Sequence, residues 1–597
     1  MNTPFIDRVH RGAKLIAISF NLRKWRYVLP FLKKPSVFIS ASVFVKDLNR
    51  LLGRSILVNK PSSDFLKELA EQALAHKITV LGSLVRTFKK MPWHEDVKSG
   101  KVWEPGKYFS DYVQIDAMDE SDVKVPWEIS RCHHLLYLGQ AYQITKEEQY
   151  AKEIVDQIED WINENPLMYS INWTCSMEVA IRAVNWMWAV YLISGSSVLN
   201  DDFARLFSKS LYEHGFFIYN NLENADKYNA NHYFSDIVGL LFLGALFRGN
   251  KKANEWFEYA LAEFQSEIRT QFLPSGFHYE RSISYHRLMT EMTGYAWALL
   301  KRMDIQLPMD VTDRIERMFI IVADYLKPNG MAPNIGDEDD GRFLPFVKYD
   351  FHYHAYLLDI YYHLTGKKLN HDYNHSTVYN DAGFGIVRQN GTYLFVSNGG
   401  VSKYPEFNKW ARTHSHNDLL SFEFFKDGKD IIIDPGTFAY TSDFKKRHEY
   451  RKTAKHNTIQ IDGKEQYTIN ERKPFDVYVD CLPMGLSVDI NQNIIELRGA
   501  YHKKNSEIDY KHFRTFRLNE SGLVIEDEVD CLGEHELNAF FHYDEKDTAS
   551  PIRTVSSGVQ LEYRDDSVST SYGVEKNSKT LVFRTRFIDK VKSTYSI

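Results

Sequence analysis

The chain has 597 residues, more than a single hydrophobic core usually serves, so two large domains are expected. Its formal net charge of −6 at neutral pH argues against a surface that binds nucleic acid or another bulk polyanion. Aromatic residues make up 14% of the chain, which fits equally well a large aromatic core or rings that stack on sugar faces. The four cysteines show no CxxC spacing, which predicts free, buried thiols.

Residues 1–60 are predicted to form a helical N-terminal extension. Arg8, Arg11 and Lys14 precede the apolar stretch Leu15–Phe20, but this stretch is short and no small-residue cleavage site follows. The missing secretory signal favours the cytoplasm over the periplasm or secretion. An ordinary packed helix is the preferred interpretation, and a basic amphipathic helix on a membrane surface is the alternative. No run approaches the roughly 18 apolar residues that a transmembrane helix needs.

Residues 61–375 carry the hydrophobic pattern of a domain of helical hairpins. Apolar residues recur at three- and four-residue spacing, and loops containing Asn, Pro or Gly separate the blocks. The predicted helical blocks are Phe65–Leu74, Ile129–Tyr142, Met177–Ile193, Phe203–Asn220 and Ala253–Glu267. Periodicity alone leaves open whether the hairpins stack into a bundle, a solenoid or a closed toroid.

Residues 376–597 show short segments rich in β-branched and aromatic residues, which predicts an antiparallel sandwich or barrel. Gly428, within Lys-Asp-Gly-Lys, signals a hairpin between two of the strands. The predicted strands are Gly385–Arg388, Tyr393–Ser397, Leu420–Phe425, Ile431–Asp434, Thr458–Ile461, Ile494–Arg498, Phe513–Leu518, Leu523–Asp527 and Leu581–Thr585.

Polar residues gather at two places next to predicted helices. Asn231 and His232 shortly precede the strongly apolar helix Ile237–Phe247, so one of them is either an N-cap or part of a site. The segment Glu280–His286, which contains Tyr285, is dense in titratable and hydrogen-bonding groups. That density is unusual on a helix that only packs, and it favours a functional site.

Two further helix starts combine Trp, Glu and Arg. The residues are Trp127, Glu128 and Arg131 in the first, and Trp173, Glu178 and Arg182 in the second. Each Glu and Arg could form an intrahelical ion pair worth about a few tenths of a kcal/mol. The rival interpretation is that Trp127 or Trp173 contacts a sugar. The acidic loop Asn334–Gly341 lacks the spacing of an EF-hand and is predicted to be solvated rather than to bind calcium.

The strand-like run from His414 to Asp418, with the sequence His-Ser-His-Asn-Asp, is the most informative stretch. In an extended segment alternate side chains share a face, so His414 and His416 can converge on one site. Asp434 and His456 each lie at a predicted strand boundary from which they can reach the same place. Two imidazoles and a carboxylate suit zinc. Any one of these histidines alone would more simply be a hydrogen-bonding core residue.

Together these segments resemble the heparinase II/III family of polysaccharide lyases, which is similar to oligoalginate lyases and to dermatan-sulfate epimerase. The resemblance runs from about residue 100 to about residue 540. It rests on the Trp-Glu-x-x-Arg helix start, Asn231-His232, Glu280–His286, the Gly-Asp loop, His-Ser-His-Asn-Asp, Asp-Pro-Gly-Thr and Lys-His-Asn-Thr. It implies an incomplete (α/α) toroid followed by an antiparallel β-sandwich, in agreement with the change of period.

The resemblance also implies catalytic roles. Asn231 and His232 would face the uronate carboxylate, Tyr285 would serve the glycosidic oxygen, and His414 would lie at the cleavage site. Ser415 departs from the family pattern, in which a small Gly is common at this position. The residues expected to contact substrate are Trp127, Glu128, Arg131, Trp173, Glu280, Tyr440 and Tyr450.

His416, Asp434 and His456 fall on the family's zinc-binding positions, so zinc is the expected cofactor, with a structural or site-ordering role. A second tyrosine acts in some members of the family. It lies between the Asp and the second His ligand, and either Tyr440 or Tyr450 could take this position.

The implied activity is β-elimination on a polysaccharide or oligosaccharide that contains uronic acid. A neutral donor would hold the carboxylate, a Tyr or His would take the C5 proton, and Tyr285 would return a proton to the departing oxygen. The alternatives are a C5-epimerase, which shares the proton abstraction, and a non-catalytic glycan-binding or assembly protein. A glycoside hydrolase is less expected, because it would use two facing carboxylates. The net charge leans toward shorter or less charged glycans.

Overall fold

The computed structural model describes residues 40–597 apart from 54–62, 83, 116–118, 225–228, 372–373, 400–413, 479, 492–493, 521, 547–550, 555 and 557. Most of the predicted N-terminal extension, including the basic segment considered for a membrane surface, lies outside the described residues. Its described part is helix α2 (Ala41–Leu52), which packs against other helices of the first half. No helix among the described residues is both long and apolar enough to cross a membrane.

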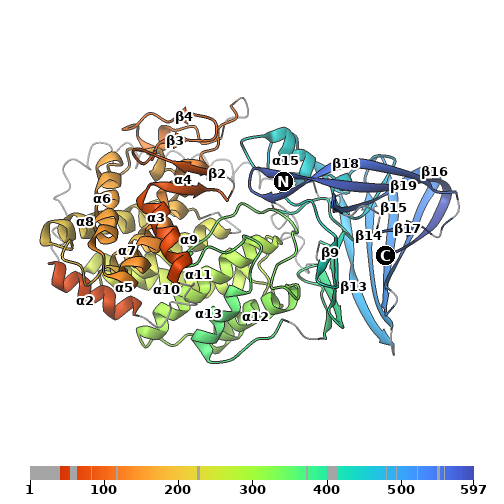
Figure 1. Ribbon diagram of the computed structural model, residues 1–597. Coiled ribbons are helices and arrows are strands. Elements are labelled where there is room, and N and C mark those ends of the chain that lie inside the picture. Colours follow the sequence, from red (N-terminus) through yellow and green to blue (C-terminus); the bar gives the residue numbers. More distant parts are fainter. Residues whose placement is uncertain are drawn as a thin grey trace, which may run out of the picture.

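The first half is an incomplete (α/α) toroid of helical hairpins, and the second half is an antiparallel β-sandwich (Figure 1). The helical and strand regions are therefore as predicted, and the toroid was reached through the resemblance. Besides α2, the helices of the toroid are α3 (Ser63–Leu74), α4 (Lys124–Ser130), α5 (His134–Thr145), α6 (Glu148–Glu164), α7 (Ser176–Leu192), α8 (Asp201–Asn220), α9 (Asn231–Leu246), α10 (Lys251–Gln271), α11 (Ile283–Arg302), α12 (Met309–Tyr325) and α13 (Tyr356–Thr365).

Most helix predictions were confirmed to within a few residues, but one was wrong. The block Ile129–Tyr142 is split between α4 and α5. Cys132 adopts a φ of 58°, which ends the first helix and turns the chain into the second. A non-glycine residue in the left-handed region is uncommon, and the apolar period does not reveal it.

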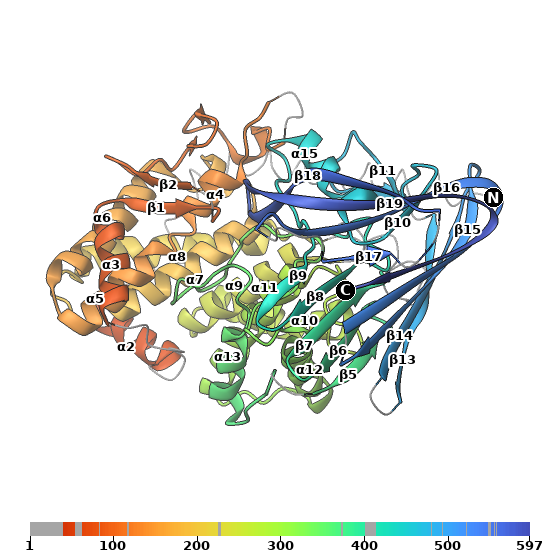
Figure 2. The same ribbon diagram turned by 45° about the vertical axis from the view of Figure 1, so that its right-hand side comes forward.

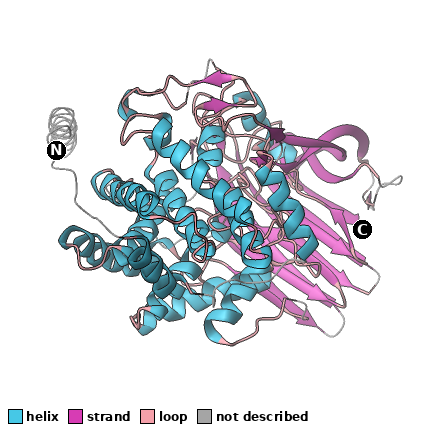
Figure 3. Cartoon of the chain, turned by 60° about the vertical axis from the view of Figure 1, so that its left-hand side comes forward, coloured by secondary structure: helices cyan, strands magenta, loops and turns pink. Residues whose placement is uncertain are grey.

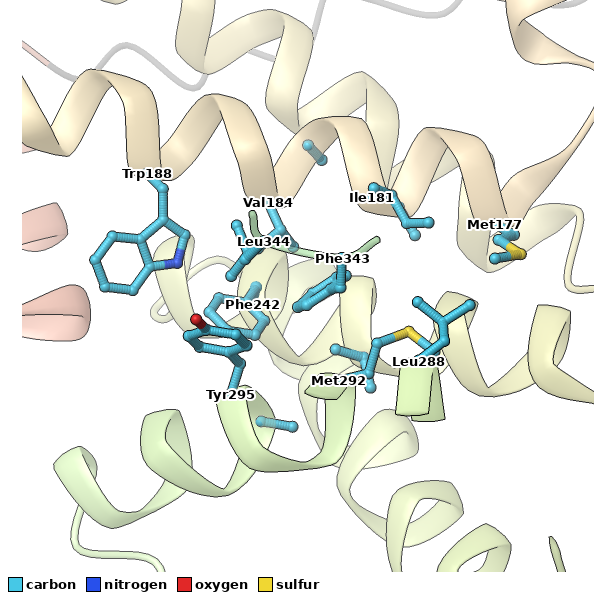
Figure 4. Close-up of a cluster of buried hydrophobic side chains, with 14 of the residues drawn as sticks. Met177, Ile181, Val184, Trp188, Phe242, Leu288, Met292, Tyr295, Phe343 and Leu344 are labelled. Atoms are coloured by element: carbon cyan, nitrogen blue, oxygen red, sulfur yellow. The ribbon is translucent and has the colours of Figure 1, made fainter. Parts of the chain in front are cut away.

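The core of the toroid surrounds α7, in which every residue is buried. Such a helix has no solvent face, so it lies at the centre of its domain rather than at the surface. Figure 4 shows one part of this core, where α7, α9, α11 and a loop meet. The labelled side chains are Met177, Ile181, Val184, Trp188, Phe242, Leu288, Met292, Tyr295, Phe343 and Leu344, none more than 5% exposed.

Figure 3 shows the strands gathered on one side of the helices. They form a five-stranded sheet in the order β5-β6-β7-β8-β9 and an eight-stranded sheet in the order β13-β14-β15-β16-β19-β17, with β10 on β16 and β18 on β19. The strands are β5 (Ser376–Tyr379), β6 (Phe384–Gln389), β7 (Thr392–Ser397), β8 (Phe422–Lys426), β9 (Lys429–Ile432), β10 (Ile459–Ile461), β13 (Cys481–Asn491), β14 (Ile494–Lys504), β15 (Asp509–Asn519), β16 (Gly522–Asp544), β17 (Arg553–Thr554), β18 (Gln560–Ser571) and β19 (Val574–Ser596). Small ladders join β1 (Lys77–Val80) to β2 (Leu84–Thr87), β3 (Glu95–Asp96) to β4 (Lys101–Val102), and β11 (Thr468–Ile469) to β12 (Val477–Tyr478).

Two features of the strands follow directly from the sequence. The predicted hairpin joins β8 to β9, and Asp427 and Gly428 at its tip have φ values of 52° and 78°. Both values suit a type I′ turn, for which Asp-Gly is favoured. Along β15 buried and more exposed residues alternate, as expected for a strand with one face on the core of a sandwich.

The toroid and the sandwich lie side by side (Figure 2), and polar contacts join them. Lys327, after α12, pairs with Glu423 on β8 at 2.8 Å. The connection between β18 and β19 reaches the toroid, where the Tyr572 hydroxyl donates to Asp122 at 2.6 Å and the Tyr572 backbone N–H donates to Asp340 at 2.9 Å. The candidate site lies along this junction.

Candidate active site

Asp337, in the loop between α12 and α13, is the centre of the candidate site. Its carboxylate accepts hydrogen bonds from His414 Nδ1 at 2.8 Å and from His416 Nε2 at 2.9 Å. Arg447 on helix α15 (Phe444–Tyr450) donates to both oxygens of the same carboxylate through its two terminal nitrogens. Asp337 is fully buried. Burial opposes its ionisation, but Arg447 and the two imidazoles hold the pKa of Asp337 well below its usual range.

This arrangement corrects two expectations. The acidic loop Asn334–Gly341 was predicted to be solvated, but Asp337 and the acidic residues after it are buried. The run from His414 to Asp418 was predicted to be strand-like, but it forms a loop outside the sheets. His414 and His416 still converge on one place, because they bind the two oxygens of a single carboxylate.

The backbone explains why a Gly precedes Asp337. Gly336 has a φ of 76°, and a Cβ at this position would lie 2.9 Å from the carbonyl oxygen of His414. The next N–H, that of Asp337, donates to this same carbonyl at 2.9 Å. Ser282, just before α11, donates to the Asp337 carbonyl at 2.6 Å. The glycine therefore allows the toroid loop and the His414 loop to pack backbone against backbone.

Tyr285, in the first turn of α11, stacks on His414. The two ring centroids are 3.9 Å apart and the ring planes differ by 20°. The Tyr285 hydroxyl lies 3.4 Å from Asp339 and can donate to it. Burial, followed by the charges of Asp339 and Asp337, raises the pKa of Tyr285 well above its usual value. Tyr285 is thus a protonated phenol at neutral pH, held face to face with an imidazole.

The structure separates the two candidate second tyrosines. Tyr440 lies beside the pair, with its ring centroid 6.3 Å from that of His414. The Lys124 ammonium lies 4.6 Å from the centre of the Tyr440 ring and also pairs with Asp339. Tyr450 is directed elsewhere, since its hydroxyl lies 2.7 Å from Glu575.

Asn231 begins α9 and is held by Glu280. Its Nδ2 lies 3.1 and 3.0 Å from the two Glu280 oxygens, while its Oδ1 is buried and has no hydrogen-bond partner among the described residues. His278 Nδ1 is 3.6 Å from Glu280. Burial lowers the pKa of His278 to about 4, and the nearby His414 contributes to this shift. Asn231 and Glu280 therefore lie within electrostatic reach of the stacked pair.

His232, the next residue of α9, has a side chain that is 45% exposed. Its Nδ1 lies 3.0 Å from Glu223, a residue of the connection after α8. Burial opposes the charged imidazole, but the Glu223 carboxylate outweighs it and raises the pKa of His232. This raised pKa favours the cationic imidazolium over the uncharged donor assumed from the sequence.

The three predicted zinc ligands are neighbours in the sandwich. The His416 and His456 ring centroids are 5.2 Å apart, and His456 Nδ1 lies 2.9 Å from Asp434. His416 Nδ1 and His456 Nε2 are buried and lack a hydrogen-bond partner among the described residues. Each of these histidines uses its other nitrogen to bind a carboxylate, which leaves the orphaned nitrogen able to act as a metal ligand. The two orphaned nitrogens suit metal ligands. Asp434, however, binds His456 on Nδ1, the opposite side of that ring, and the three predicted ligands do not all present donor atoms within 4.8 Å of one another.

The remaining predicted contacts lie in the toroid core. Trp173 is 1% exposed and packs on Trp161 and His214, so its ring has no free face for a sugar. Trp127 is 9% exposed and donates its indole N–H to a backbone carbonyl at 3.0 Å. Both tryptophans are therefore packed side chains rather than exposed rings that could stack on a sugar.

The two predicted ion pairs have different outcomes. Arg131 pairs with Glu128 at 2.9 Å, as expected. The expected pair of Glu178 with Arg182 is not seen, because Arg131 binds Glu178 with two bonds of 2.7 Å. Arg182 instead lies 4.0 Å from the centre of the Trp161 ring.

Sequence reasoning missed Asp337, Asp339, Arg447 and Lys124 as members of the site. Gly336 carried a usable signal, because a glycine in a loop is typical of a positive φ or a close backbone approach. Arg447 lies in a strongly charged segment, Lys445 to Glu449, whose sequence is also typical of a solvated surface helix. Lys124 had no distinguishing signal.

A cleft of about 380 Å³ opens beside Tyr572, whose ring centroid is 5.4 Å from that of Tyr440. Its wall carries cationic and acidic groups, with more of the latter. The charged lining residues are Arg86, Lys98, Asp96, Glu120, Asp122 and Asp443. Among the described residues, the lining of this cleft carries more carboxylates than cations.

Two family models match the chain: heparinase II/III N-terminus over residues 59–371 and heparinase II/III-like, C-terminal, over residues 373–588. A heparin-sulfate lyase of Pedobacter heparinus is 24% identical over 370 residues, which are 59% of this chain and 54% of that protein. A heparin-sulfate lyase of Bacteroides stercoris is 21% identical over 388 residues, 61% of this chain and 58% of that protein. The chain thus spans a little more than half the length of these curated relatives.

Solved structures give the same architecture. A crystal structure of heparinase III superimposes with a TM-score of 0.67 at 15% identity, covering 93% of this chain and 88% of that one. A heparan sulfate lyase, HepC from Pedobacter heparinus, gives a TM-score of 0.57 at 20% identity and covers 93% of this chain and 87% of that chain. At these identities the likeness establishes the shared fold.

Proposed function

Since this chain belongs to the heparinase II/III family, we propose that it is a polysaccharide lyase that cleaves a uronate-containing glycan by β-elimination. The observation that carries the proposal is the stacked pair of Tyr285 and His414, with His414 held by the Asp337 carboxylate. A phenol and an oriented imidazole supply the acid and the base that elimination needs. They sit where the toroid meets the sandwich, within reach of the Glu280 charge.

The base in this proposal is His414. Its Nδ1 is engaged by Asp337, so Nδ1 carries the hydrogen and Nε2 presents a lone pair. A carboxylate that fixes an imidazole in this way sets its tautomer and its direction. His414 Nε2 then accepts the proton from C5 of the uronate.

The acid is Tyr285. Its raised pKa keeps the phenol protonated at neutral pH, so it can give its proton to the departing glycosidic oxygen. The bond between this oxygen and C4 breaks as the C4–C5 double bond forms, and no water is consumed. Asp339 can accept a hydrogen bond from the Tyr285 hydroxyl and hold it in place until it reacts.

The substrate carboxylate must be held and its charge offset for C5 to lose a proton. One N–H of Asn231 can bridge both Glu280 oxygens, which leaves the other for the substrate. His232, with its raised pKa and half-exposed ring, supplies a cationic donor one residue further on. A well-placed donor to the charge that develops in the transition state is worth about 3 to 4 kcal/mol.

The matched relatives are named for heparin-sulfate, and we propose a related but less anionic substrate for this chain. The cleft beside Tyr572 is lined by more carboxylates than cations. Such a wall would repel a densely sulfated chain and tolerate one with a single carboxylate per repeat.

The experiment combines a product assay with a single substitution. A panel of sulfated and unsulfated uronate polymers is incubated with the protein, and absorbance from the new conjugated double bond is followed. Tyr285→Phe should lower kcat by about 100-fold or more with little change in KM, because it removes only the proton donor. Trp173→Phe is the control and should keep its activity.

The outcomes separate the rival functions. Solvent deuterium entering the glycan without cleavage would show an epimerase. Binding of a glycan that Tyr285→Phe leaves unchanged, with neither absorbance nor exchange in the wild type, would show a binding protein and overturn the proposal.

We also propose that His416, Asp434 and His456 hold zinc, which would order the loop that presents His414. The orphaned nitrogens of both histidines support this assignment. His456→Ala should lose one equivalent of metal by elemental analysis and lower both the melting temperature and kcat, because the metal holds three segments together. A variant with unchanged metal content, or one that loses metal and stays equally heat-stable and active, would contradict the proposal.

A further inference from the structure

Three side chains in the toroid, distant in sequence from the predicted zinc ligands, form a second candidate metal site. Among the described residues they are the only three His, Cys, Asp or Glu side chains whose ligand atoms all lie within 4.8 Å of one another. The three are Cys175, Glu223 and His232. We propose that they bind a divalent transition-metal ion of the zinc type.

The distances between these donor atoms match those around tetrahedral zinc. Cys175 Sγ lies 3.7 Å from His232 Nδ1 and 3.5 Å from the nearer Glu223 oxygen, and His232 Nδ1 lies 3.0 Å from the other oxygen. Zinc–ligand bonds of about 2.0 to 2.3 Å at tetrahedral angles separate ligand atoms by about 3.3 to 3.6 Å. The cluster would need to adjust by only a few tenths of an ångström.

The donors are presented by three separate segments that the fold fixes. Cys175 is the residue before α7, Glu223 lies after α8, and His232 is the second residue of α9. Glu223 also accepts the N–H of Met177 at 2.9 Å through Oε2, which locks its carboxylate against the start of α7. A site whose ligands are already held in place loses little conformational entropy when the ion binds.

The charge around the cluster also favours a cation. Asp236, one turn after His232 on α9, is fully buried, and its Oδ1 has no hydrogen-bond partner among the described residues. Its other oxygen accepts the Glu223 N–H at 2.8 Å. Burial and the Glu223 charge raise the pKa of Asp236 well above its usual value, so Glu223 supplies the negative charge of the cluster. A bound dication would offset the Glu223 charge.

Thiolate, imidazole and carboxylate together select a zinc-type ion over magnesium or calcium, which prefer oxygen ligands only. Binding exchanges the Cys175 S–H bond for a sulfur–metal bond, and the proton leaves to solvent. Three protein ligands leave a fourth position for water or a substrate oxygen. His232 would release its Nδ1 proton to solvent, bind the ion through Nδ1 and keep its Nε2–H for substrate, so the bound ion would replace the imidazolium as the positive charge there. The site is thus compatible with the proposed function and does not depend on it.

Cobalt(II) provides a test that needs no glycan. A thiolate bound to cobalt gives a near-ultraviolet charge-transfer band, whereas the site formed by His416, Asp434 and His456 contains no sulfur. The full-length protein should show this band when cobalt is added, and Cys531→Ser should retain it as the matched cysteine control. Cys175→Ser should abolish the band. His456→Ala should keep it, even if that variant loses its other metal.

Affinity gives a second measurement. Competition with a chromophoric chelator should show zinc binding at this site weakened about 100-fold or more in Cys175→Ser and in Glu223→Gln, since even residues behind a ligand contribute 10- to 100-fold. Circular dichroism verifies that the variants are folded. A wild type without the band, or a band that survives in Cys175→Ser, would overturn the proposal, whatever the lyase assay shows.

Discussion

Asp337 links the chemistry of the two halves at the level of single atoms. One Asp337 oxygen accepts a hydrogen bond from His414, the other accepts one from His416, and Arg447 binds both oxygens. His414 belongs to the candidate catalytic pair and His416 to the candidate zinc set. A shift of this carboxylate would therefore change the aim of the base and the geometry of the metal site together.

The two candidates for the second tyrosine of the site, Tyr440 and Tyr450, lead to opposite predictions. The Tyr440 hydroxyl lies in the site and has no hydrogen-bond partner among the described residues, so Tyr440→Phe should leave the unfolding free energy unchanged or slightly higher. It should lower kcat by about 100-fold, the usual cost of losing one donor near developing charge. Urea unfolding and steady-state kinetics measure the two effects.

Tyr450→Phe is the matched comparison. It removes hydrogen bonds to Glu575 and Ser567, so the unfolding free energy should fall by about 1 kcal/mol while kcat stays near that of the wild type. If the activity loss fell on Tyr450 instead, the assignment of Tyr440 to the site would be wrong.

At this scale the sequence could predict which residue types matter, but not which of them meet. Asn231, Tyr285 and His414 carried visible signals because their neighbours form distinctive motifs. Lys124 pairs with Asp339, 215 residues away, and no local pattern records a contact of that range. The choice between Tyr440 and Tyr450 likewise depends on tertiary packing.

At the scale of elements, substitution of Gly336 tests the contact between its loop and the His414 loop, and Gly428 serves as the control position. Both glycines have a positive φ, 76° and 78°, so alanine should cost about 1 to 2 kcal/mol of strain at either position. Only at Gly336 does the new Cβ meet another loop, at the His414 carbonyl, whereas Gly428 has nothing within 4 Å. Gly336→Ala should therefore also lower kcat, by about tenfold or more, because it displaces the base.

The measurement compares both variants by urea unfolding and by kcat under conditions in which each is fully folded. Gly428→Ala should show the stability loss alone. Equal activity in the two variants would mean that the contact between the Gly336 loop and the His414 loop does not position the base.

The strands show how far local patterns extend. Segments such as Leu523–Asp527 and Leu581–Thr585 were predicted correctly but are parts of β16 and β19, each 23 residues long. Their outer portions carry exposed charged residues and a register shift between Asp530 and Glu534. Short apolar windows detect the part of a strand that lies over the core and miss the rest, since pairing with a neighbouring strand extends it.

At the scale of the whole molecule, the buried pair of Asp337 and Arg447 joins the toroid to the sandwich. Arg447→Met would leave a buried carboxylate without its countercharge, which typically costs about 3 to 5 kcal/mol. Arg514→Met is the control, because Arg514 is equally buried and binds Asp527 at 2.6 and 2.8 Å within the sandwich. Both variants should be destabilised, and only Arg447→Met should also lower kcat of the folded protein.

The stability that the pair of Asp337 and Arg447 contributes depends on pH, and the sign of this dependence can be stated. The pKa of Asp337 is depressed in the folded protein. Its contribution to the unfolding free energy is therefore fully present above the pKa of an unfolded Asp, about 4, and is lost as the pH falls through the folded pKa. Without Arg447, this pKa would be less depressed, because only the two imidazole hydrogen bonds would then oppose the effect of burial. The difference in unfolding free energy between wild type and Arg447→Met should be largest at neutral pH and narrow below about pH 4. A difference independent of pH would contradict this account.

The contact between Tyr572 and Asp122 spans 450 positions of the chain. The Tyr572 hydroxyl also accepts the backbone N–H of Tyr440. Tyr440 of the candidate site is therefore anchored by the β18–β19 hairpin, which is translated after the other parts of the site. A ribosome-bound chain that has exposed the whole toroid and most of the sandwich still lacks this anchor. The nascent protein should therefore gain the proposed activity in full only after the β18–β19 hairpin has emerged and folded back onto the toroid.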